Sequence, residues 1–245
     1  MAREQRERER EGPGRDGVTP VDGVDRGPSA ERVADALRAG VCPSDRAFDR
    51  FLPYRWRLAS GQHWTPLVVA LKVARWLDAL AVKTVVDIGS GAGKFCVAAA
   101  LASHCDFTGI EQRPRLVEAA GGLARTFGVQ DRARFVQGIL EQCSLPEADA
   151  YYLYNPFGEN LFGPDGLDGR LGDDVELSEE RYERDVAFME AFLERARVGT
   201  YIIKYNGFGG RMPPTYDLIR VDRGMSNVLS VWRKIRTRGV SPGAQ

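Results

Sequence analysis

The sequence predicts an α/β fold: a doubly wound, mostly parallel sheet of seven strands with an N-terminal helical cap. From residue 65 onward, short runs rich in β-branched residues alternate with stretches of helical length and periodicity. A glycine-rich turn directly follows the first of these runs, as expected where a buried strand leads into a helix. Apolar residues make up 43% and charged residues 28% of the 245-residue chain, which suits a globular domain with a sizeable core.

The composition divides the chain into four parts. Residues 1–28 hold few large apolar side chains and begin with alternating Arg and Glu, so we expect a disordered charged tail. A short charged helix laced by Glu–Arg pairs is the alternative. We expect residues 29–64 to form the helical cap, residues 65–237 the main domain and residues 238–245 a C-terminal tail.

Runs of β-branched and aromatic residues between turn residues give the strands. The expected strands are Thr84–Ile88, Asp106–Glu111, Arg134–Gln137, Ala150–Tyr154, Thr200–Tyr205, Asp217–Val221 and Val228–Ile235. The expected helices are Ala30–Ala39 in the cap and, in the main domain, 65–80, 94–103, 114–127 and 178–197. We expect Thr65 to cap its helix with Pro66 at the first helical position, and Ser178 to cap the last helix.

The cap contains an aromatic- and Arg-rich stretch, FDRFLPYRWRL. We expect this stretch to pack against the main domain, because aromatic side chains at such spacing are usually buried. The alternative is that Tyr54 and Trp56 line a pocket for a ligand.

Charge and cysteine usage narrow the possible partners. Lys+Arg and Asp+Glu both number 34, so no global basic field favours nucleic acid or an acidic membrane surface, although a local basic patch fits these totals. The four cysteines form no C-x-x-C pair and only two histidines occur, so we expect no metal site. Without a disulfide framework, a signal segment or an apolar run long enough to span a bilayer, the chain is expected to be cytoplasmic.

The most informative segment is VVDIGSGAGKF, residues 85–95. Gly89, Gly91 and Gly93 follow the first strand at alternate positions, and glycine there permits positive φ and close approach of the backbone to a ligand. The next helix points its N-terminal N–H groups and the positive end of its dipole at the same place. The turn therefore predicts a site for an anionic group, either a carboxylate or a phosphate.

Two kinds of cofactor fit a glycine-rich turn of this type. A dinucleotide site prefers G-x-G-x-x-G, whereas this turn reads G-x-G-x-G with Asp87 two residues before the first glycine. A carboxylate at that position suits the α-amino group of S-adenosylmethionine better than it suits a pyrophosphate. Glu111 ends the next strand, 24 residues after Asp87, where a carboxylate can accept both ribose hydroxyls in either kind of site.

Four segments in chain order, VVDIGSGAG, FTGIEQRPRLVEAA, ARFVQG and YYLYNPFG, resemble motifs I to IV of the class I S-adenosylmethionine-dependent methyltransferases. The resembling region runs from about Thr65 to Asn206. The resemblance implies S-adenosyl-L-methionine as the cofactor, with Glu111 at its ribose. The residues that it implies at the methionine part are Asp87, Gly89, Ser90, Gly91 and Gly93.

The resemblance also implies that Gln112 and the segment Gly138–Leu140 flank the adenine. Members of the family often carry an acid directly after the glycine that matches Gly138, where it bonds the adenine amino group. Here Ile139 occupies that position, and Glu141 is the nearest acid that could replace it.

The segment SGQHWTPL, residues 60–67, precedes the first strand by about one helix. A similarly placed segment closes over the cofactor in several methyltransferase families. Thr65 would then contact the methionine carboxylate, with the plain helix cap as the alternative. His63 is a candidate base or acceptor contact, with a structural role as the alternative.

Asn155-Pro156-Phe157-Gly158 follows the fourth strand and would face the methyl group. It resembles the N-P-P-[FY] motif of amino-methylating enzymes, with one proline missing, and more loosely an Asn-containing segment of histone lysine methyltransferases built on this fold. An Asn oxygen and a nearby carbonyl can accept two N–H bonds, and an aromatic ring can stack on a planar acceptor. Asn155, Pro156 and Phe157 are the candidate catalytic residues and nitrogen the expected acceptor; a simple strand-ending turn is the alternative.

Two loops are further candidates for the acceptor side. Residues 157–175 are rich in Gly and Asp, which predicts either a lid whose acids favour a cationic acceptor or a surface insertion. Tyr205–Gly209 follows the fifth strand and is expected at the same edge of the sheet.

The sequence thus predicts transfer of a methyl group from S-adenosylmethionine to an unidentified acceptor, with a nitrogen on a small molecule or protein side chain favoured over nucleic acid. The donor is already activated, so the absence of strong acid–base machinery is no objection. A nicotinamide-dependent oxidoreductase is the first alternative, and the glycine spacing argues against it. A non-catalytic methyltransferase-like binding module is the second, and the intact glycines and both acids argue against it.

Overall fold

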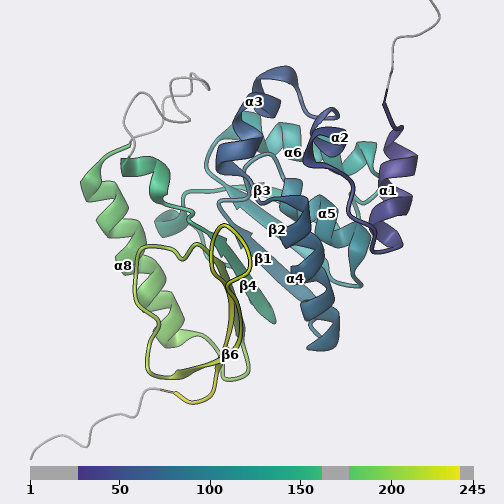
Figure 1. Ribbon diagram of the computed structural model, residues 1–245. Helices are drawn as coiled ribbons and strands as arrows, with labels where there is room; N and C mark the ends of the chain where they lie inside the picture. The colour runs from purple at the N-terminus through teal and green to yellow at the C-terminus, as the bar shows by residue number, and fades with distance from the viewer. Residues whose placement is uncertain (1–26, 162–176, 238–245) are drawn as a thin grey trace, which may run out of the picture.

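The computed structural model describes residues 27–161 and 177–237 (Figure 1). The expected N-terminal tail lies outside the described residues except for its last two positions, and so does the expected C-terminal tail. Most of the loop expected at 157–175 is outside them as well.

Seven strands form one sheet in the order β3-β2-β1-β4-β5-β7-β6. The strands are β1 (Thr84–Ile88), β2 (Asp106–Glu111), β3 (Ala133–Gln137), β4 (Ala150–Tyr154), β5 (Tyr201–Tyr205), β6 (Tyr216–Asp222) and β7 (Leu229–Lys234). Strands β1 to β5 pair in parallel, and β7 is antiparallel to both β5 and β6. The predicted doubly wound, mostly parallel seven-stranded sheet is therefore confirmed.

The strand order reverses between β1 and β4, which lie side by side in the middle of the sheet. From β1 the chain moves outward to β2 and β3, and it then returns to β4 on the other side of β1. The register pairs Val85 with Ala150 and Ile88 with Leu153, so the two strands end within one residue of each other. Ligands of α/β proteins bind at such a reversal, beyond the carboxyl ends of the strands.

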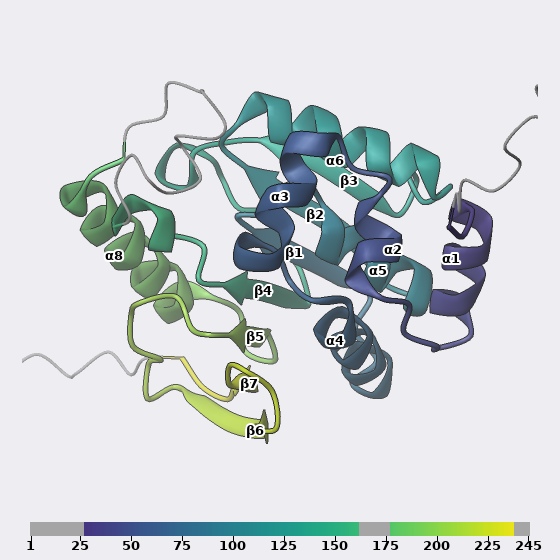
Figure 2. The same cartoon turned by 45° about the horizontal axis from the view of Figure 1, so that its top comes forward.

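Helices cover both faces of the sheet (Figures 1 and 2). The helices of the main domain are α4 (Leu67–Ala79), α5 (Lys94–Ala102), α6 (Pro114–Thr126) and α8 (Glu179–Arg195). The first three share one apolar cluster with the cap, whereas α8 packs in a second cluster on the opposite face. Neighbouring strand residues such as Tyr151 and Tyr152 divide between the two clusters, because successive side chains point to opposite faces.

The capping signals in the sequence agree with the structure at the start of α8 but not at the start of α4. Ser178 caps α8 through its hydroxyl, as predicted. The expected cap at Thr65 and the expected first helical position of Pro66 are both wrong, because α4 begins at Leu67 and Pro66 is its N-cap. The N–H of Leu67 donates to the Asp45 carboxylate at 3.0 Å. The Thr65 hydroxyl instead bonds the buried Tyr152 hydroxyl at 2.9 Å.

The cap consists of α1 (Ala30–Arg38), α2 (Asp45–Asp49) and α3 (Tyr54–His63). Trp56 is 1% exposed and packs in the core, as expected, whereas Tyr54 begins α3 and is 72% exposed. Neither residue borders the cavity described below, so the alternative in which both line a ligand pocket is wrong. The rings of Phe48 and Phe127 stack with centroids 4.7 Å apart and join the cap to the end of α6.

A buried lysine also joins the cap to the main domain. Lys94 begins α5 and is 2% exposed, and its ammonium lies 2.6 Å from an Asp45 oxygen and 2.9 Å from an Asp49 oxygen. The ammonium donates to the Ser60 hydroxyl at 2.9 Å as well. Because these partners belong to α2 and α3, one cation ties two cap helices to the start of α5. The two carboxylates also offset the unfavourable position of a cation at a helix N-terminus.

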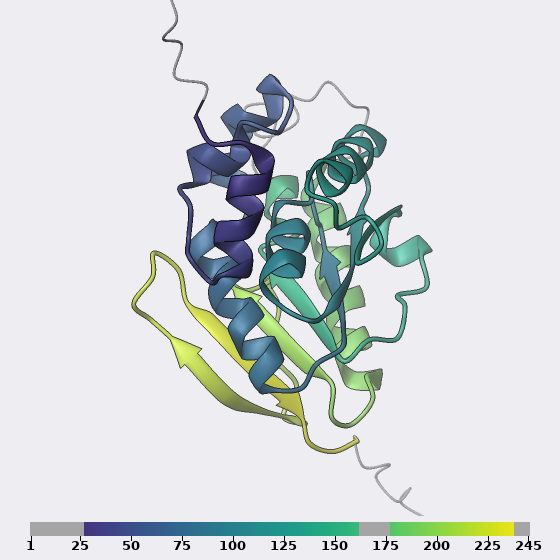
Figure 3. The same ribbon diagram turned by 90° about the vertical axis from the view of Figure 1, so that its right-hand side faces the viewer.

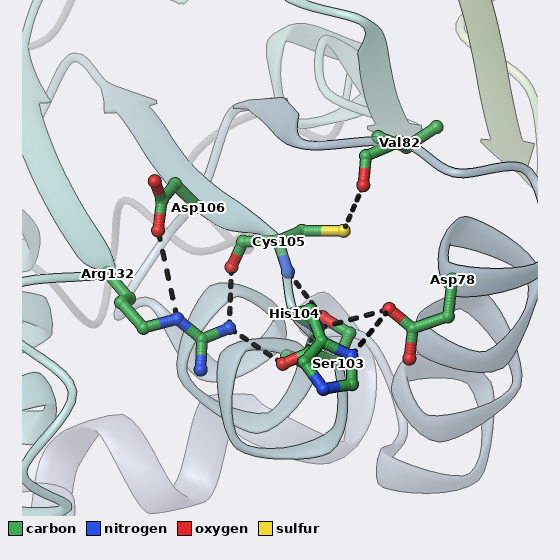
Figure 4. A network of polar contacts seen from close by, with 8 residues as sticks. Asp78, Val82, Ser103, His104, Cys105, Asp106 and Arg132 are labelled. Carbon is green, nitrogen blue, oxygen red and sulfur yellow. Dashed lines mark hydrogen bonds and ion pairs between the residues drawn. The ribbon is translucent and has the colours of Figure 1, made fainter.

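Polar contacts at the amino ends of the strands hold the loop between α5 and β2 in place (Figure 4). The Arg132 guanidinium donates to the carbonyl oxygens of Ser103 and Cys105 at 2.7 and 2.8 Å. Asp78 accepts the N–H of His104 at 3.0 Å, and the His104 side chain is 91% exposed. His104 is therefore a surface residue at the edge of the sheet opposite the carboxyl ends.

Helix α4 lies alongside the antiparallel edge of the sheet (Figure 3). The Arg220 guanidinium lies 5.1 Å from the centroid of the Trp76 ring, and Lys72 forms an ion pair with Asp222. The Lys72 side chain is 36% exposed, so this pair lies at the surface, unlike that of Lys94. Surface ion pairs contribute about 0–1 kcal/mol, because solvent screens the charges.

We expect Lys94→Met to lower the free energy of unfolding by about 3–5 kcal/mol, because it leaves the Asp45 and Asp49 carboxylates without their buried cation. Lys72→Met is the matched control, with an expected loss below about 1 kcal/mol. Urea unfolding of both variants measures the difference. Equal losses in the two variants would contradict a stabilising role of the buried lysine.

Candidate functional site

A main cavity of about 650 Å³ opens at the carboxyl ends of the strands, a volume typical of small-molecule sites. Lining residues from β1, β2, α6 and the segments after β1, β2 and β3 are Ile88, Gly89, Gly91, Ile110, Glu111, Gln112, Leu116, Gly138 and Leu140. Those from the end of β4, the loops after β4 and β5 and the β6–β7 loop are Tyr154, Asn155, Pro156, Phe157, Asn206 and Asn227. Those from η2 (Gly158–Leu161) and α8 are Glu159, Asn160, Arg181 and Asp185. The remaining wall, at the end of α3, comprises Gln62, His63 and Trp64.

The turn after β1 is held open by glycine. Gly89, Gly91 and Gly93 all have positive φ, of 74°, 55° and 79°. A Cβ on Gly91 would lie 2.6 Å from the Trp64 indole nitrogen, and one on Gly93 would lie 2.7 Å from the Ala120 methyl. Gly89 and Gly91 line the main cavity, whereas Gly93 is the N-cap residue of α5 and serves close packing beneath the turn.

Glu111 lies at the end of β2, where its carboxylate borders the main cavity. One oxygen accepts the Gly91 N–H at 3.0 Å and the other accepts the Arg113 N–H at 2.9 Å. Burial and the nearby charge of Glu159 raise the pKa of Glu111 from 4.5 to about 7, although the two N–H groups and the Arg113 charge oppose this. The carboxylate is thus held in a fixed position, and it keeps lone pairs free to accept hydroxyl groups of a ligand.

Asp87 lies beneath the glycine turn and borders a small side cavity rather than the main one. Burial raises the pKa of Asp87 from 3.8 to about 7, and the Cys96 thiol donates a hydrogen bond to its carboxylate at 3.3 Å. Ser90 and Thr65 border the same side cavity, and Trp64 lines both cavities. The buried Ser90 hydroxyl has no hydrogen-bond partner among the described residues. The side cavity therefore places the Asp87 carboxylate and the Ser90 hydroxyl next to the glycine-rich turn.

The segments expected near an adenine divide between the cavity wall and its surroundings. Gln112 lines the main cavity and donates to the Glu159 carboxylate at 2.7 Å. Leu140 lines it as well, together with the glycine before it in the predicted segment, but Ile139 between them does not. Glu141 also lies outside the wall, with its carboxylate 3.7 Å from the Arg184 guanidinium. Glu141 is therefore not placed to act as the missing acid.

Asn155, Pro156 and Phe157 all line the main cavity, directly after β4. The backbone of Asn155 is left-handed, with φ of 42°, and its N–H donates to the Gly207 carbonyl in the loop after β5 at 3.0 Å. A Cβ on Gly158 would overlap the amide of Asn155, so this glycine makes room for the Asn155 side chain. Phe157 is 4% exposed and packs in the apolar cluster that contains α8, so its ring forms part of the floor of the main cavity.

Other predicted acceptor-side residues are only partly at the cavity. His63 lines both cavities. Within the predicted segment Tyr205–Gly209, only Asn206 borders the main cavity, while Phe208 is fully buried in the α8 cluster. The prediction that this segment lines the site therefore holds for one residue, because Tyr205 at the end of β5 and Phe208 after the bend are both buried in the apolar core. The expected lid at 157–175 lies mostly outside the described residues.

The polar residues of η2 and α8 at the cavity were not among the residues predicted from the sequence. One guanidinium nitrogen of Arg113 donates to both Glu159 carboxylate oxygens, at 2.6 and 2.8 Å. On α8, Arg181 and Asp185 form an ion pair at 2.9 Å, and both side chains are 6% exposed. The i, i+4 spacing of Arg181 and Asp185 was a visible signal for an ion pair on a helix. No local pattern indicated that this pair is buried beside a cavity.

The ranges that the structure describes are residues 27–161 and 177–237. Within them, no group of three or more His, Cys, Asp or Glu residues is arranged to hold a metal ion. No helix in these ranges is both long and apolar enough to cross a membrane.

Comparisons with known proteins identify the domain type. Residues 81–152 match a family model described as a methyltransferase domain. No curated protein sequence matches the chain. The structure is similar to that of an RNA methyltransferase from Salinibacter ruber in complex with S-adenosyl-L-homocysteine (TM-score 0.51, 21% identity, 74% of this chain and 99% of that chain covered). It is also similar to an O-methyltransferase from Bacillus cereus in complex with SAH (TM-score 0.52, 13% identity, 84% and 96% covered). The class I methyltransferase fold implied by the resemblance is therefore confirmed.

We expect the free energy of unfolding of the ligand-free protein to fall as the pH rises toward about 7. The pKa values of Asp87 and Glu111 are raised from 3.8 and 4.5 to about 7, so the folded chain keeps protons that the unfolded chain has lost in this interval. Asp87→Asn removes one of these ionisations. The free energy of unfolding of this variant should exceed that of the wild type by about 2–4 kcal/mol at pH 8. At pH 4 the two values should differ little, and urea unfolding measures both.

Asp149→Asn is a control of opposite sign. Burial raises the pKa of Asp149, but hydrogen bonds from Lys83 and Thr84 outweigh this effect, so that the pKa of Asp149 is lowered overall. Its ionised form therefore stabilises the fold, and Asp149→Asn should be less stable than the wild type at pH 8. Asp87→Asn with the same loss at pH 8 would show that the Asp87 charge is not costly.

Proposed function

We propose that this chain, a class I methyltransferase by its fold and by the domain at residues 81–152, transfers the methyl group of S-adenosylmethionine to a nitrogen acceptor. The acceptor nitrogen belongs to a small molecule or a protein side chain. The observation that carries the proposal is the pair of buried acids, Asp87 and Glu111, on either side of the glycine-rich turn.

The residues around the turn fit S-adenosylmethionine in chemistry. The Glu111 carboxylate can accept the ribose hydroxyls at the end of β2. Asp87 and the unpartnered Ser90 hydroxyl adjoin the turn, where the amino-acid part binds. Both acids have pKa values near 7 because they are buried, so a ligand that carries positive charge favours their ionised forms. A cofactor with an ammonium and a sulfonium group supplies that charge.

When bound, S-adenosylmethionine supplies an already activated methyl group, so the protein contributes mainly by positioning the acceptor. The Asn155 amide oxygen and a backbone carbonyl of the same loop accept N–H bonds from the acceptor, which aims the nitrogen lone pair at the methyl carbon. Gly158 supports this role, because the absence of a side chain there leaves space that the Asn155 amide occupies. Pro156 contacts the Gly89 position, where a Cβ would lie 3.1 Å from the Pro156 Cβ, so the acceptor loop and the cofactor turn are in contact.

Calorimetry with S-adenosylhomocysteine tests the cofactor assignment. Glu111→Ala should weaken binding by about 1.5–3 kcal/mol, because it removes charged hydrogen bonds to the ribose. Glu141→Ala is the control, since its carboxylate lies outside the cavity wall and should leave the affinity unchanged. Absence of binding to the wild type, together with quenching of NADH fluorescence, would replace the proposal by a nicotinamide-dependent activity.

The acceptor role of Asn155 predicts a loss of transfer without a loss of cofactor binding. Asn155→Ala and Gly158→Ala should each lower the incorporation of radiolabelled methyl into cell extract by about 100-fold, because a misplaced acceptor loses the in-line geometry. Both variants should bind S-adenosylhomocysteine as the wild type does.

A matched glycine substitution provides the control for this experiment. Gly122→Ala in α6 meets only the Arg125 side chain, at 3.9 Å, and should transfer methyl groups at the wild-type rate. Full activity of both Asn155→Ala and Gly158→Ala would argue that the loop after β4 is only a strand-ending turn. Cofactor binding without transfer by the wild type to any extract would favour a non-catalytic binding module.

A further inference from the structure

A buried polar cluster closes the α8 end of the main cavity. Arg181 and Asp185 are each 5% exposed and Asn160 is 7% exposed, and all three line the cavity. One Asp185 oxygen accepts the Arg181 guanidinium at 2.9 Å and the Asn160 amide nitrogen at 3.4 Å. The cluster is thus organised around a single carboxylate oxygen.

Two acceptor oxygens of this cluster remain unsatisfied. The second carboxylate oxygen of Asp185 and the amide oxygen of Asn160 are buried and have no hydrogen-bond partner among the described residues. The amide orientation is well defined, because a carboxylate only accepts and therefore takes the N–H side of Asn160. Buried acceptors without partners are rare and costly, so two of them beside one cavity indicate a ligand that carries N–H donors.

The charge of the cluster narrows the kind of donor. Asp185 is already paired with the buried Arg181, so the carboxylate does not need a second cation. A neutral group with two N–H bonds satisfies both oxygens without adding an unbalanced charge. An aromatic amino group has this chemistry.

The cluster lies beside the segment that follows β3. Helix α8 contacts both η2 and η1 (Leu140–Gln142), and Arg184 of α8 forms an ion pair with Glu141 of η1. Leu140 also shares an apolar cluster with Met189 of α8. The two unsatisfied oxygens are therefore at the β3 side of the cavity wall.

The order of the strands sets the direction of the cofactor. In the proposed function, its amino-acid part lies at the turn after β1 and its ribose at Glu111, which ends β2. Because β2 lies between β1 and β3 in the sheet, a ligand that follows this line carries its base toward β3. The base then reaches the part of the wall formed by Leu140, Asn160 and Asp185.

We propose that Asn160 and Asp185 accept the two hydrogens of the adenine 6-amino group and so replace the acid that Ile139 does not supply. Arg181 is a positioning residue, since its guanidinium bonds the other oxygen of the Asp185 carboxylate. This inference rests on the proposed function, because it takes the cofactor to be an adenosine derivative. It makes η2 and α8 responsible for the choice of base.

The test compares S-adenosylhomocysteine with its analogue in which a hydrogen replaces the 6-amino group, by calorimetry on the full chain. The wild type should bind the amino compound about 10- to 100-fold more tightly, as expected for hydrogen bonds to a charged cluster. Asn160→Leu and Asp185→Asn should each reduce this ratio to below about 5-fold, mainly by weakening the amino compound. Glu141→Gln, whose carboxylate is outside the cavity wall, should keep the wild-type ratio.

The outcomes separate this inference from the proposed function. Tight binding of both compounds by the wild type, or an unchanged ratio in both cluster variants, would overturn the inference and leave the proposed function intact. Absence of S-adenosylhomocysteine binding by the wild type would overturn both. Thermal unfolding of each variant checks the fold, and the two-ligand comparison on the wild type needs no variant at all.

Discussion

The hydrogen bond from the Gly91 N–H to the Glu111 carboxylate joins the turn after β1 to the end of β2, and the cavity depends on it. The turn can come this close only because its glycines have positive φ and carry no side chain under Trp64. The Arg113 N–H holds the other carboxylate oxygen, so Glu111 faces the cavity in one orientation. Two neighbouring strand ends thereby become one preorganised surface.

This surface has an energetic cost that a ligand can offset. Asp87 and Glu111 are both buried, and their pKa values lie near 7 instead of near 4. Lys94 borders the side cavity but is already engaged by Asp45 and Asp49. A ligand that brings its own positive charge stabilises the ionised acids, so binding and folding are linked in the same direction.

The opposite wall depends on a different constraint, the close junction of three loops. The Asn155 N–H bonds the Gly207 carbonyl and the Asn206 N–H bonds the Val228 carbonyl, so the loops after β4 and β5 and the β6–β7 loop are joined through the backbone. Asn155 and Asn206 both have left-handed backbones, with φ of 42° and 62°. Such conformations are costly for residues other than glycine and are concentrated at functional sites. The wall therefore combines a fixed backbone with amide side chains.

The sequence alone determined the features that depend on neighbouring residues. Strands β1, β2 and β4 have their predicted bounds, β3 and β5 differ by one residue at one end, and β6 and β7 differ by one residue at each end. The turn and Glu111 were predictable for the same reason, since their places follow from where the strands end. Only the tertiary structure decided that Glu159, Asn160 and Asp185 border the cavity, because no local pattern records which face of α8 packs beside η1. The tertiary structure also decided that the Thr65 hydroxyl bonds a buried residue 87 positions away in the sequence instead of capping a helix, because the fold brings the two hydroxyl groups together.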